Sequence, residues 1–275
     1  MHGLGNDFVV IDQRRAPIDL STSLITAMGD RHRGIGFDQL ILIEPASGSD
    51  MAANLRFYNS DGSIAGACGN GTRCAASIVM AEAGLDELWL GSPAGPLGIK
   101  AAGNALVTVA MPPPKIAWHE IPLAREVDTL ALPIEVAGLP APAAVSMGNP
   151  HAVFFVDDVA ALDIGTLGPI LEHDPLFPDR ANIGFAQTLP DGSIRLRVFE
   201  RGAGLTLACG SGACAAFVAA VRRGLAHDSA RMIVDGGSME IAWTGDLADP
   251  VMMTGPVALS FTGQWASGLE EANGE

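Results

Sequence analysis

Two cysteines stand at the start of the same short motif in distant parts of the chain. Cys68 opens the sequence Cys-Gly-Asn-Gly, and Cys209 opens Cys-Gly-Ser-Gly 141 positions later. A run of small and apolar residues follows each motif and predicts a buried helix that begins at the glycines. The unpaired N–H groups and the dipole of a helix start favour negative charge, so they lower the pKa of a thiol and hold a carboxylate. The sequence therefore predicts a reactive thiolate beside an anion cradle, twice.

The pairing of the two motifs is what favours chemistry over packing. A single cysteine at a helix start is commonly just a small core residue, but two in equivalent motifs favour a shared function. The other two cysteines, Cys74 and Cys214, lie inside the predicted helices among alanines, so we expect core thiols. The spacings between the cysteines do not match a zinc site, and no lysine follows the glycines as in a phosphate-binding loop. We expect no metal.

The motifs belong to an internal duplication, which predicts two copies of one unit. Three further segments recur in the same order with offsets between 141 and 148: 55–59 as 196–200, 35–39 as 183–187, and 5–6 as 148–149. The duplication predicts an α+β fold of two strand-rich domains, related by a pseudo-twofold axis, each wrapped around a buried central helix. We expect one domain to span 1–112, completed by a C-terminal strand within 256–275, and the other to span 115–255.

Local patterns predict the elements of each copy. Alternation of apolar and polar residues predicts strands, and a glycine just past an apolar run predicts a helix end. The expected helices cover 74–83 and 214–223 and stop at Gly84 and Gly224. The expected strands are 55–58, 106–111, 194–199, 232–235, 239–243 and 257–261. The proline run 112–114 is the expected linker between the two copies.

A symmetric pair of thiols suits inversion of a stereocentre. If the helix starts face each other across a cleft, a carbon between them has one sulfur on each side. One thiolate then removes the α-proton and the opposing thiol delivers another. Inversion through pyridoxal phosphate needs a Schiff-base lysine, and the only lysines, Lys100 and Lys115, are poorly placed for that role. The sequence therefore favours a cofactor-independent epimerase in which the helix starts stabilise the carbanion.

The composition excludes two broad classes of partner. The 275 residues carry a formal net charge of −15, with a pI near 4.6. Binding to nucleic acid or to an anionic membrane surface depends on clustered Lys and Arg, so we expect neither partner. The first residues lack the basic and apolar regions of a signal peptide, and no apolar run is long enough to span a membrane. We expect a cytoplasmic protein with reduced thiols.

Over essentially its whole length the sequence resembles the diaminopimelate epimerases. The resemblance is carried by three motifs: residues 1–8, residues 59–63 leading to 67–74, and residues 200–204 leading to 208–214. It implies interconversion of L,L- and meso-diaminopimelate, on the route to lysine and peptidoglycan. It also implies an active site between the two domains and a homodimer. Compared with the family the chain begins a few residues late, which predicts a short first strand.

The resemblance also implies a role for individual residues. Cys68 and Cys209 match the acid–base pair, and His151 and Glu200 match groups that tune the two thiols. The residues that match substrate contacts are the side chains of Asn6, Gln39, Asn59, Asn149, Asn182, Glu200 and Arg201, and the backbone of Gly69, Asn70, Gly210 and Ser211. Several amides with one acid and one arginine suit a zwitterion that has two amino and two carboxylate groups. Ile64 and Leu205 depart from the family, since many members have Glu there.

Two other functions remain open from the sequence. A proline or hydroxyproline epimerase has a similar fold and also uses two cysteines, but it does not need Arg201 and the amides that suit a distal amino-acid head. A non-catalytic protein of duplicated form would hold a small anion at the helix starts. Exchange of the substrate α-proton with solvent deuterium would separate the enzymes from the binding protein.

Overall fold

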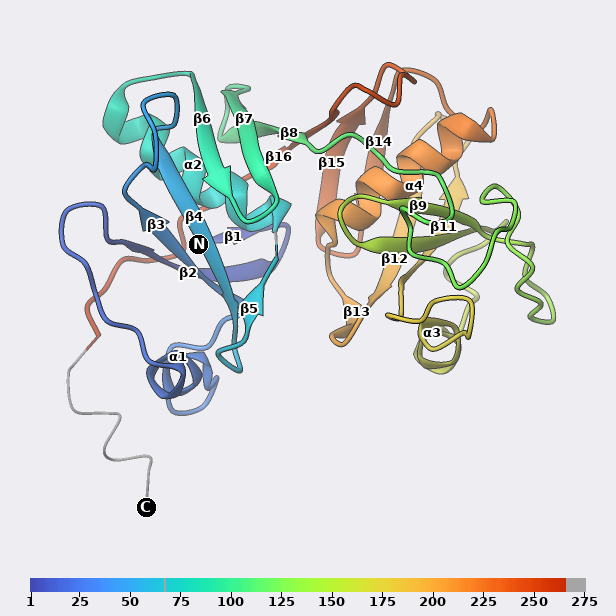
Figure 1. Cartoon of the computed structure of the whole chain (residues 1–275), viewed down its shortest axis with the longest axis horizontal. Coiled ribbons are helices and arrows are strands. Elements are labelled where there is room, and N and C mark those ends of the chain that lie inside the picture. The colour runs from blue at the N-terminus through green and yellow to red at the C-terminus, as the bar shows by residue number, and fades with distance from the viewer. Residues whose placement is uncertain (67, 266–275) are drawn as a thin grey trace. The chain divides into compact units, whose positions relative to one another are not determined.

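The computed structural model describes residues 1–66 and 68–265, which form two compact units (Figure 1). Unit 1 contains Met1–Val109 together with the segment that begins at Gly255, and unit 2 contains Ala110–Thr254. Of the C-terminal strand expected within 256–275, residues 266–275 lie outside the described residues. We describe each unit by itself.

Unit 1 has eight strands and two helices in the described residues, the last strand ending just beyond its boundary. They are β1 (His2–Gly3), β2 (Asn6–Asp12), α1 (Thr22–Gly29), β3 (Gln39–Glu44), β4 (Ala53–Asn59), β5 (Ile64–Ala65), α2 (Gly69–Ala83), β6 (Glu87–Ser92), β7 (Gly95–Ala101) and β8 (Leu106–Met111). The first strand, β1, is two residues long.

Unit 2 repeats the same order of elements. They are β9 (Ala143–Ser146), β10 (Pro150–Phe155), α3 (Ile164–Glu172), β11 (Asn182–Thr188), β12 (Ile194–Glu200), β13 (Gly204–Thr206), α4 (Gly210–Arg222), β14 (Ser229–Val234), β15 (Gly237–Ala242) and β16 (Val251–Pro256). The last strand, β16, runs two residues past the unit boundary.

The strand pairing of the two units is the same. In unit 1, β2 pairs with β1 and, in parallel, with β3, and β4 pairs with β3, β5 and β6. In unit 2, β10 pairs with β9 and, in parallel, with β11, and β12 pairs with β11, β13 and β14. The orientation of every one of these pairs agrees between the units. The duplicated α+β fold predicted from the sequence is therefore confirmed.

One of the sequence matches is out of register. In unit 1 Phe8 pairs with Gln39, and at the equivalent place in unit 2 His151 pairs with Asn182. Gln39 therefore corresponds to Asn182, and the predicted match of 35–39 with 183–187 is wrong. Residues 35–38 form a loop before β3, whereas 183–187 lie inside β11. A match of five residues in sequence does not determine the hydrogen-bond register of a strand.

A largely buried helix occupies the centre of each unit. Helix α2 contacts β1, β2, β3, β4, β6 and β7, and α4 contacts β9, β10, β11, β12, β14 and β15. Alanine and glycine dominate both helices and let the surrounding strands approach closely. Gly84 ends α2 with a positive φ of 65°, where a residue without Cβ is unstrained. Both central helices, predicted from their apolar runs, are confirmed.

The strand predicted at 257–261 is wrong. Those residues form only an isolated bridge between Ala258 and His2, and the last strand is instead β16. It ends in Gly255-Pro256, a pair that is typical of turns, so the sequence did not predict a strand there. The burial pattern alternates along it, with Val251, Met253 and Gly255 inside, so the strand is defined by its packing rather than by its composition.

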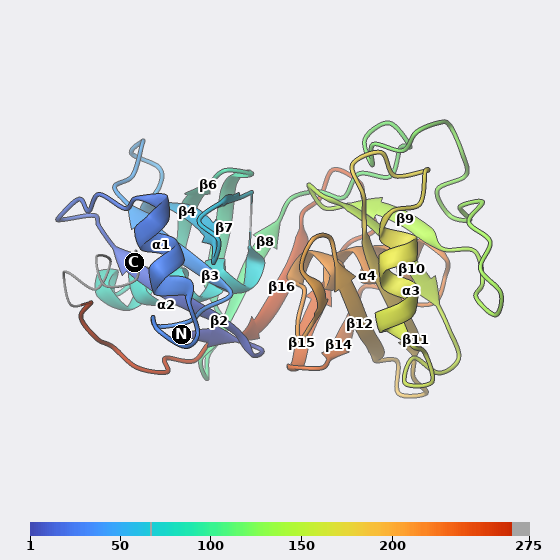
Figure 2. The same ribbon diagram turned by 90° about the horizontal axis from the view of Figure 1, so that it is seen from below.

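The second helix of each unit, α1 or α3, packs against an apolar cluster of its own unit. Figure 2 shows α1 and α3 in front of the strands of their units. Helix α1 packs over a cluster that includes Ile25 and Phe37, and α3 over one that includes Ile164 and Phe185. Of the helices in 1–66 and 68–265, none has the length and apolar character needed to cross a membrane.

Candidate active site

Cys68 is the N-cap of the central helix of unit 1. Its Sγ accepts a hydrogen bond from the backbone N–H of Gly71 at 3.3 Å, and the thiol donates to Oδ1 of Asn6 at 3.9 Å. A Cβ at Gly71 would lie 2.7 Å from Ile41 and 3.4 Å from the sulfur. A larger residue at position 71 would therefore have to displace the end of the Ile41 side chain. The side chain of Cys68 is half-buried.

A chain of amides extends from this sulfur into the core of unit 1. Asn70 Nδ2 donates to Asn6 Oδ1 at 3.4 Å, and Asn6 Nδ2 donates to Asp38 at 2.6 Å. Arg73, fully buried in α2, donates to Asn70 Oδ1 at 2.8 Å. The backbone of Gly255 passes directly over Arg73, because a Cβ there would lie 2.9 Å from the guanidinium carbon. Sequence reasoning missed both Asp38 and Arg73; an arginine within an apolar helix was the available signal.

Gln39 and Asn59 form a second polar pair, on neighbouring strands. They face each other across β3 and β4, and Gln39 Nε2 donates to Asn59 Oδ1 at 3.1 Å. Asn59 in turn donates to Ser63 Oγ at 3.0 Å. Gln39 Oε1 is buried and has no hydrogen-bond partner among the described residues. A buried acceptor without a donor is costly, so this oxygen suits an N–H group of a ligand.

Cys209 is the N-cap of the central helix of unit 2. Its Sγ accepts from the backbone N–H of Gly212 at 3.3 Å, as in unit 1, and lies 3.6 Å from Ser211 Oγ. Asn149 Oδ1 lies 3.0 Å from His151 Nε2, and because this oxygen only accepts, Nε2 carries the proton. His151 Nε2 and Asn149 Nδ2 then both donate to Ser211 Oγ, at 3.1 and 3.3 Å. The hydroxyl of Ser211 is left to donate to the sulfur.

Burial sets the charge state of the groups around Cys209. Loss of water raises the pKa of the Cys209 thiol well above its usual range, and the carboxylate of Glu200 raises it further. The hydrogen bonds from Ser211 and Gly212 act in the opposite direction but are outweighed. The expectation that the helix start lowers this pKa is therefore wrong for Cys209. Burial, followed by the charge of Arg201, lowers the pKa of His151 to about 3, so its ring is neutral near pH 7.

Glu200, Arg201 and Asn182 meet where β12 ends. Glu200 accepts from Thr206 Oγ1 at 2.5 Å. Asn182 Oδ1 accepts from the backbone N–H of Arg201 at 3.0 Å, and its Nδ2 donates to the carbonyl of Pro150 at 3.0 Å. Asn182 therefore ties this segment to β10.

Four further residues that the sequence singled out lie outside these hydrogen-bonded clusters. Cys74 and Cys214 are fully buried inside the central helices, and burial raises the pKa of Cys74 to about 11. Ile64 and Leu205, the two departures from the family, are exposed on β5 and β13, with 70% and 42% of their surfaces open to solvent.

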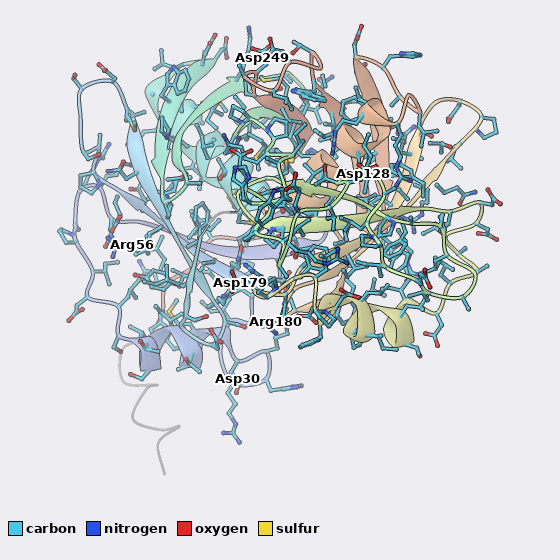
Figure 3. All side chains as sticks on the ribbon, turned by 45° about the vertical axis from the view of Figure 1, so that its right-hand side comes forward. Asp30, Arg56, Asp128, Asp179, Arg180 and Asp249 are labelled. Atoms are coloured by element: carbon cyan, nitrogen blue, oxygen red, sulfur yellow. The ribbon has the colours of Figure 1, made fainter. Side chains whose placement is uncertain are left out.

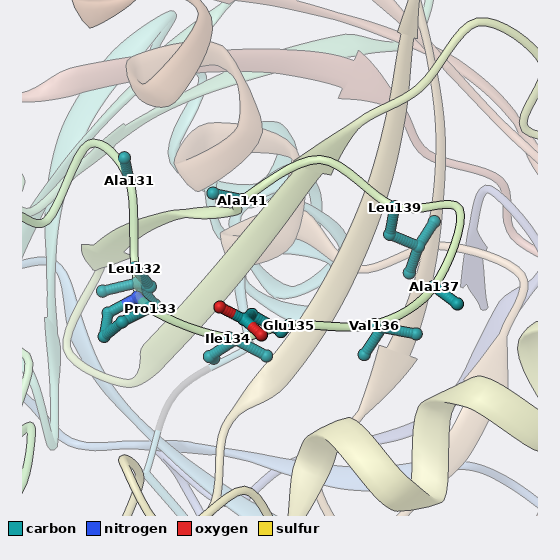
Figure 4. A pocket seen from close by; sticks show the side chains of 9 residues that line it. All are labelled: Ala131, Leu132, Pro133, Ile134, Glu135, Val136, Ala137, Leu139 and Ala141. Carbon is teal, nitrogen blue, oxygen red and sulfur yellow. The ribbon is translucent and has the colours of Figure 1, made fainter.

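A surface hollow and a metal centre are two other kinds of candidate site. The loop 131–141 forms a hollow in unit 2 that is lined mostly by aliphatic side chains, with Glu135 as its only ionisable group (Figure 4). None of the predicted site residues lines it. Within 1–66 and 68–265, His, Cys, Asp and Glu side chains nowhere gather in groups of three or more that could hold a metal ion.

Sequence comparison decides the family. The sequence model of diaminopimelate epimerase matches residues 1–117 and 143–260. The diaminopimelate epimerase of Acidiphilium cryptum (strain JF-5) is 54% identical over 96% of this chain and 94% of the relative. That of Rhodospirillum centenum is 51% identical over 98% of this chain and 92% of the relative. The chain belongs to the diaminopimelate epimerase family.

Solved structures show a wider range of proteins with this fold. A probable proline racemase from Agrobacterium radiobacter K84 superposes with a TM-score of 0.67, at 16% identity, over 97% of this chain and 91% of that one. A Bacillus anthracis protein of the PhzF family superposes with a TM-score of 0.64, also at 16% identity, over 93% and 92%. At such identity the likeness concerns the fold alone, so it does not favour a proline epimerase over a diaminopimelate epimerase.

Proposed function

We propose that this member of the family epimerises L,L-diaminopimelate to meso-diaminopimelate with Cys68 and Cys209 as its acid–base pair and without a cofactor. One observation carries the proposal. In each unit a cysteine caps the buried central helix, and its sulfur is held by the N–H of the glycine three residues later, at 3.3 Å in both. Identity of about half the residues to named diaminopimelate epimerases supports the choice of substrate.

The reaction needs two proton transfers at one carbon. One thiolate takes the α-proton, so that a C–H bond breaks, an S–H bond forms, and the electron pair stays on the carbon and its carboxylate. The opposing thiol then gives its proton to the other side of the carbon, inverting it and leaving a thiolate. The N–H groups of Gly69, Asn70, Gly210 and Ser211 are the donors proposed to hold the α-carboxylate as its charge grows.

The raised pKa of Cys209 supports a choice of starting protonation states within this proposal. Burial and Glu200 keep Cys209 protonated in the ligand-free chain, so Cys209 begins as the acid. The role of the first base then falls to Cys68, once its thiol has lost the proton that it donates to Asn6 Oδ1 in the ligand-free chain. After one turnover the two states are exchanged, and the reverse reaction uses the same pair in the opposite sense.

The remaining polar groups suit the rest of a zwitterionic substrate. Glu200 and the buried Gln39 Oε1 offer acceptors to ammonium groups. Arg201 offers a planar donor to a carboxylate. The amides of Asn6, Asn59 and Asn149 add further donors and acceptors, and Asn182 acts through the backbone of Arg201. A cytoplasmic location and a homodimer are part of the same proposal and rest on the resemblance to the family.

Isotope exchange tests the proposal directly. The purified protein is incubated with L,L-diaminopimelate in deuterated solvent, and substrate and product are analysed at early times. We expect meso-diaminopimelate that carries deuterium, while the remaining substrate stays largely protonated, because each sulfur serves one face. Product that retains the substrate's own hydrogen would instead indicate a single base. No exchange at all would indicate a binding protein.

A further inference from the structure

Helix α3 presses directly on the end of β12. A Cβ at Gly168 would lie 2.3 Å from the ring of Phe199, so only a glycine permits this approach. Residues four apart lie on the same face of a helix, and Glu172 is four residues after Gly168, at the last position of α3. The packing of α3 on Phe199 therefore carries the Glu172 side chain to the segment that follows it, residues 200–202.

Glu172 is a buried carboxylate that accepts hydrogen bonds from residues 202 and 180. Only 6% of its side chain is exposed. Oε1 accepts from the backbone N–H of Gly202 at 2.9 Å and from the guanidinium of Arg180 at 3.2 Å. Gly202 has a positive φ of 76°, in a turn closed by a bond from Ala203 N–H to the carbonyl of Glu200 at 3.1 Å. A buried charge is retained only where it is compensated by partners of this kind.

Arg201 is next to both hydrogen-bond partners of Glu172. It precedes Gly202 in the chain, and its side chain contacts the residue before Arg180. Its side chain donates to the carbonyl of Asp179 at 2.9 Å, and the next residue after Asp179 is Arg180, the ion-pair partner of Glu172. Arg180 has a positive φ of 59°, unusual for a residue with a side chain. Figure 3 labels Asp179 and Arg180 beside α3. The segment 179–180 on one side and Gly202 on the other are thus joined through one carboxylate.

Unit 1 lacks this device at the equivalent place. The β2–β3 and β10–β11 registers make Gly29, the last residue of α1, the counterpart of Glu172. A Cβ at Gly29 would lie 2.7 Å from the carbonyl oxygen of Ser60, which stands where unit 2 has Arg201. There the helix end touches the loop backbone and needs no charged group. The carboxylate occurs only in the unit whose loop carries the arginine.

We propose that Glu172 is a positioning residue that fixes the turn at residues 200–202 and thereby aims Arg201 at a carboxylate of the substrate. The aim of the arginine rests on the proposed function; the effect of Glu172 on the turn does not. Arg201 contacts the substrate in the ground state and the transition state alike, so its misplacement weakens binding more than turnover.

Steady-state kinetics of three variants measure this effect. Glu172→Ala removes both bonds, and we expect KM for L,L-diaminopimelate to rise about tenfold while kcat changes less than about threefold. Glu172→Gln keeps an acceptor for Gly202 and should recover part of the loss. Asp235→Ala is the control, because Asp235 is another carboxylate of unit 2 that pairs with arginine, here Arg195 and Arg197, away from this segment. It should leave KM unchanged. A wild-type KM in Glu172→Ala would overturn the proposal.

A double-mutant cycle asks whether Glu172 acts through Arg201. If it does, adding Glu172→Ala to Arg201→Lys raises KM little further, whereas independent residues would multiply their effects. Multiplied effects would overturn the aiming of Arg201 while leaving the epimerase itself intact.

Amide exchange reads the turn without any substrate. We expect the N–H of Gly202 to exchange slowly in the wild-type chain and faster in Glu172→Ala, with thermal unfolding as the check on folding. Fast exchange in the wild-type chain would overturn the proposal, even if neither variant folded.

Discussion

The two units share a backbone but differ in the groups that can ionise. Aligned by strand register, Phe8 of unit 1 stands where unit 2 has His151, and Asn59 stands where unit 2 has Glu200. The Sγ–N–H geometry at the helix cap is nevertheless the same in both, at 3.3 Å. The two units therefore share the hydrogen bond between sulfur and helix start, which depends on backbone and glycine. They differ in the ionisable side chains near the thiol.

Unit 2 shows that a helix start does not by itself set the pKa of the capping thiol. Cys209 caps a helix start, yet its pKa is raised because burial and the Glu200 carboxylate outweigh the hydrogen bonds from Ser211 and Gly212. The helix cap thus fixes the position of the Cys209 sulfur, while burial and Glu200 set its protonation.

The largest expected effect separates the capping cysteines from the interior ones. Cys68→Ala or Cys209→Ala should abolish epimerisation, a loss of about a thousandfold or more, because each removes one of two proton carriers. Cys74→Ala and Cys214→Ala should keep most activity, because those thiols lie in the core. Epimerisation assays on the four purified variants make the comparison. Equal losses in all four, together with loss of bound zinc, would favour a metal site.

Exchanging the acid of unit 2 for an amide should make its thiol more like an ordinary one. After burial, the Glu200 carboxylate is the next cause that raises the pKa of Cys209, so Glu200→Gln should lower the pH at which this thiolate forms. Ultraviolet titration of the thiolate in a Cys68→Ala background measures the shift. Asn59→Ala, the equivalent position in unit 1, is the control and should leave the titration in place. An unchanged curve in Glu200→Gln would contradict the assigned cause.

His151 should make the stability of the chain depend on pH where Phe8 cannot. Its pKa is about 3 when folded against 6.5 for the ordinary group, so the unfolded chain binds the proton first. Its contribution to stability is present above pH 6.5 and falls towards pH 3, by about 1.4 kcal/mol per pH unit. Denaturant unfolding at several pH values should show this slope reduced in His151→Phe. An equal slope would place the acid sensitivity elsewhere.

The smallest effects are expected at the two departures from the family. Ile64 of unit 1 and Leu205 of unit 2 are both exposed. Ile64→Glu and Leu205→Glu should therefore each change the free energy of unfolding by less than about 0.5 kcal/mol. Epimerase activity should stay within about twofold. A large loss in only one variant would show that the two hairpins have different tasks.

The sequence revealed features that depend on neighbours along the chain. The Cys-Gly-x-Gly motifs predicted both helix caps, and Gly84 predicted a helix end, because capping is local. The pKa of Cys209 and the contacts of Arg73 and Glu172 were not predictable, since each depends on groups that tertiary packing brings near. Strand β16 was not predicted because Gly255 indicates a turn in the sequence. In the structure this glycine lies within the strand, where its small size lets the backbone pass over Arg73.

That crossing of Gly255 over Arg73 has a consequence for synthesis on the ribosome. Unit 2 is continuous from Ala110 to Thr254, so all its residues are made before Gly255 is added. Unit 1 begins the chain, but the segment that covers its buried arginine comes after the whole of unit 2. The half of the protein that is translated first is therefore the half that is completed last, and the packing around Arg73 is complete only when the final stretch of chain has been added.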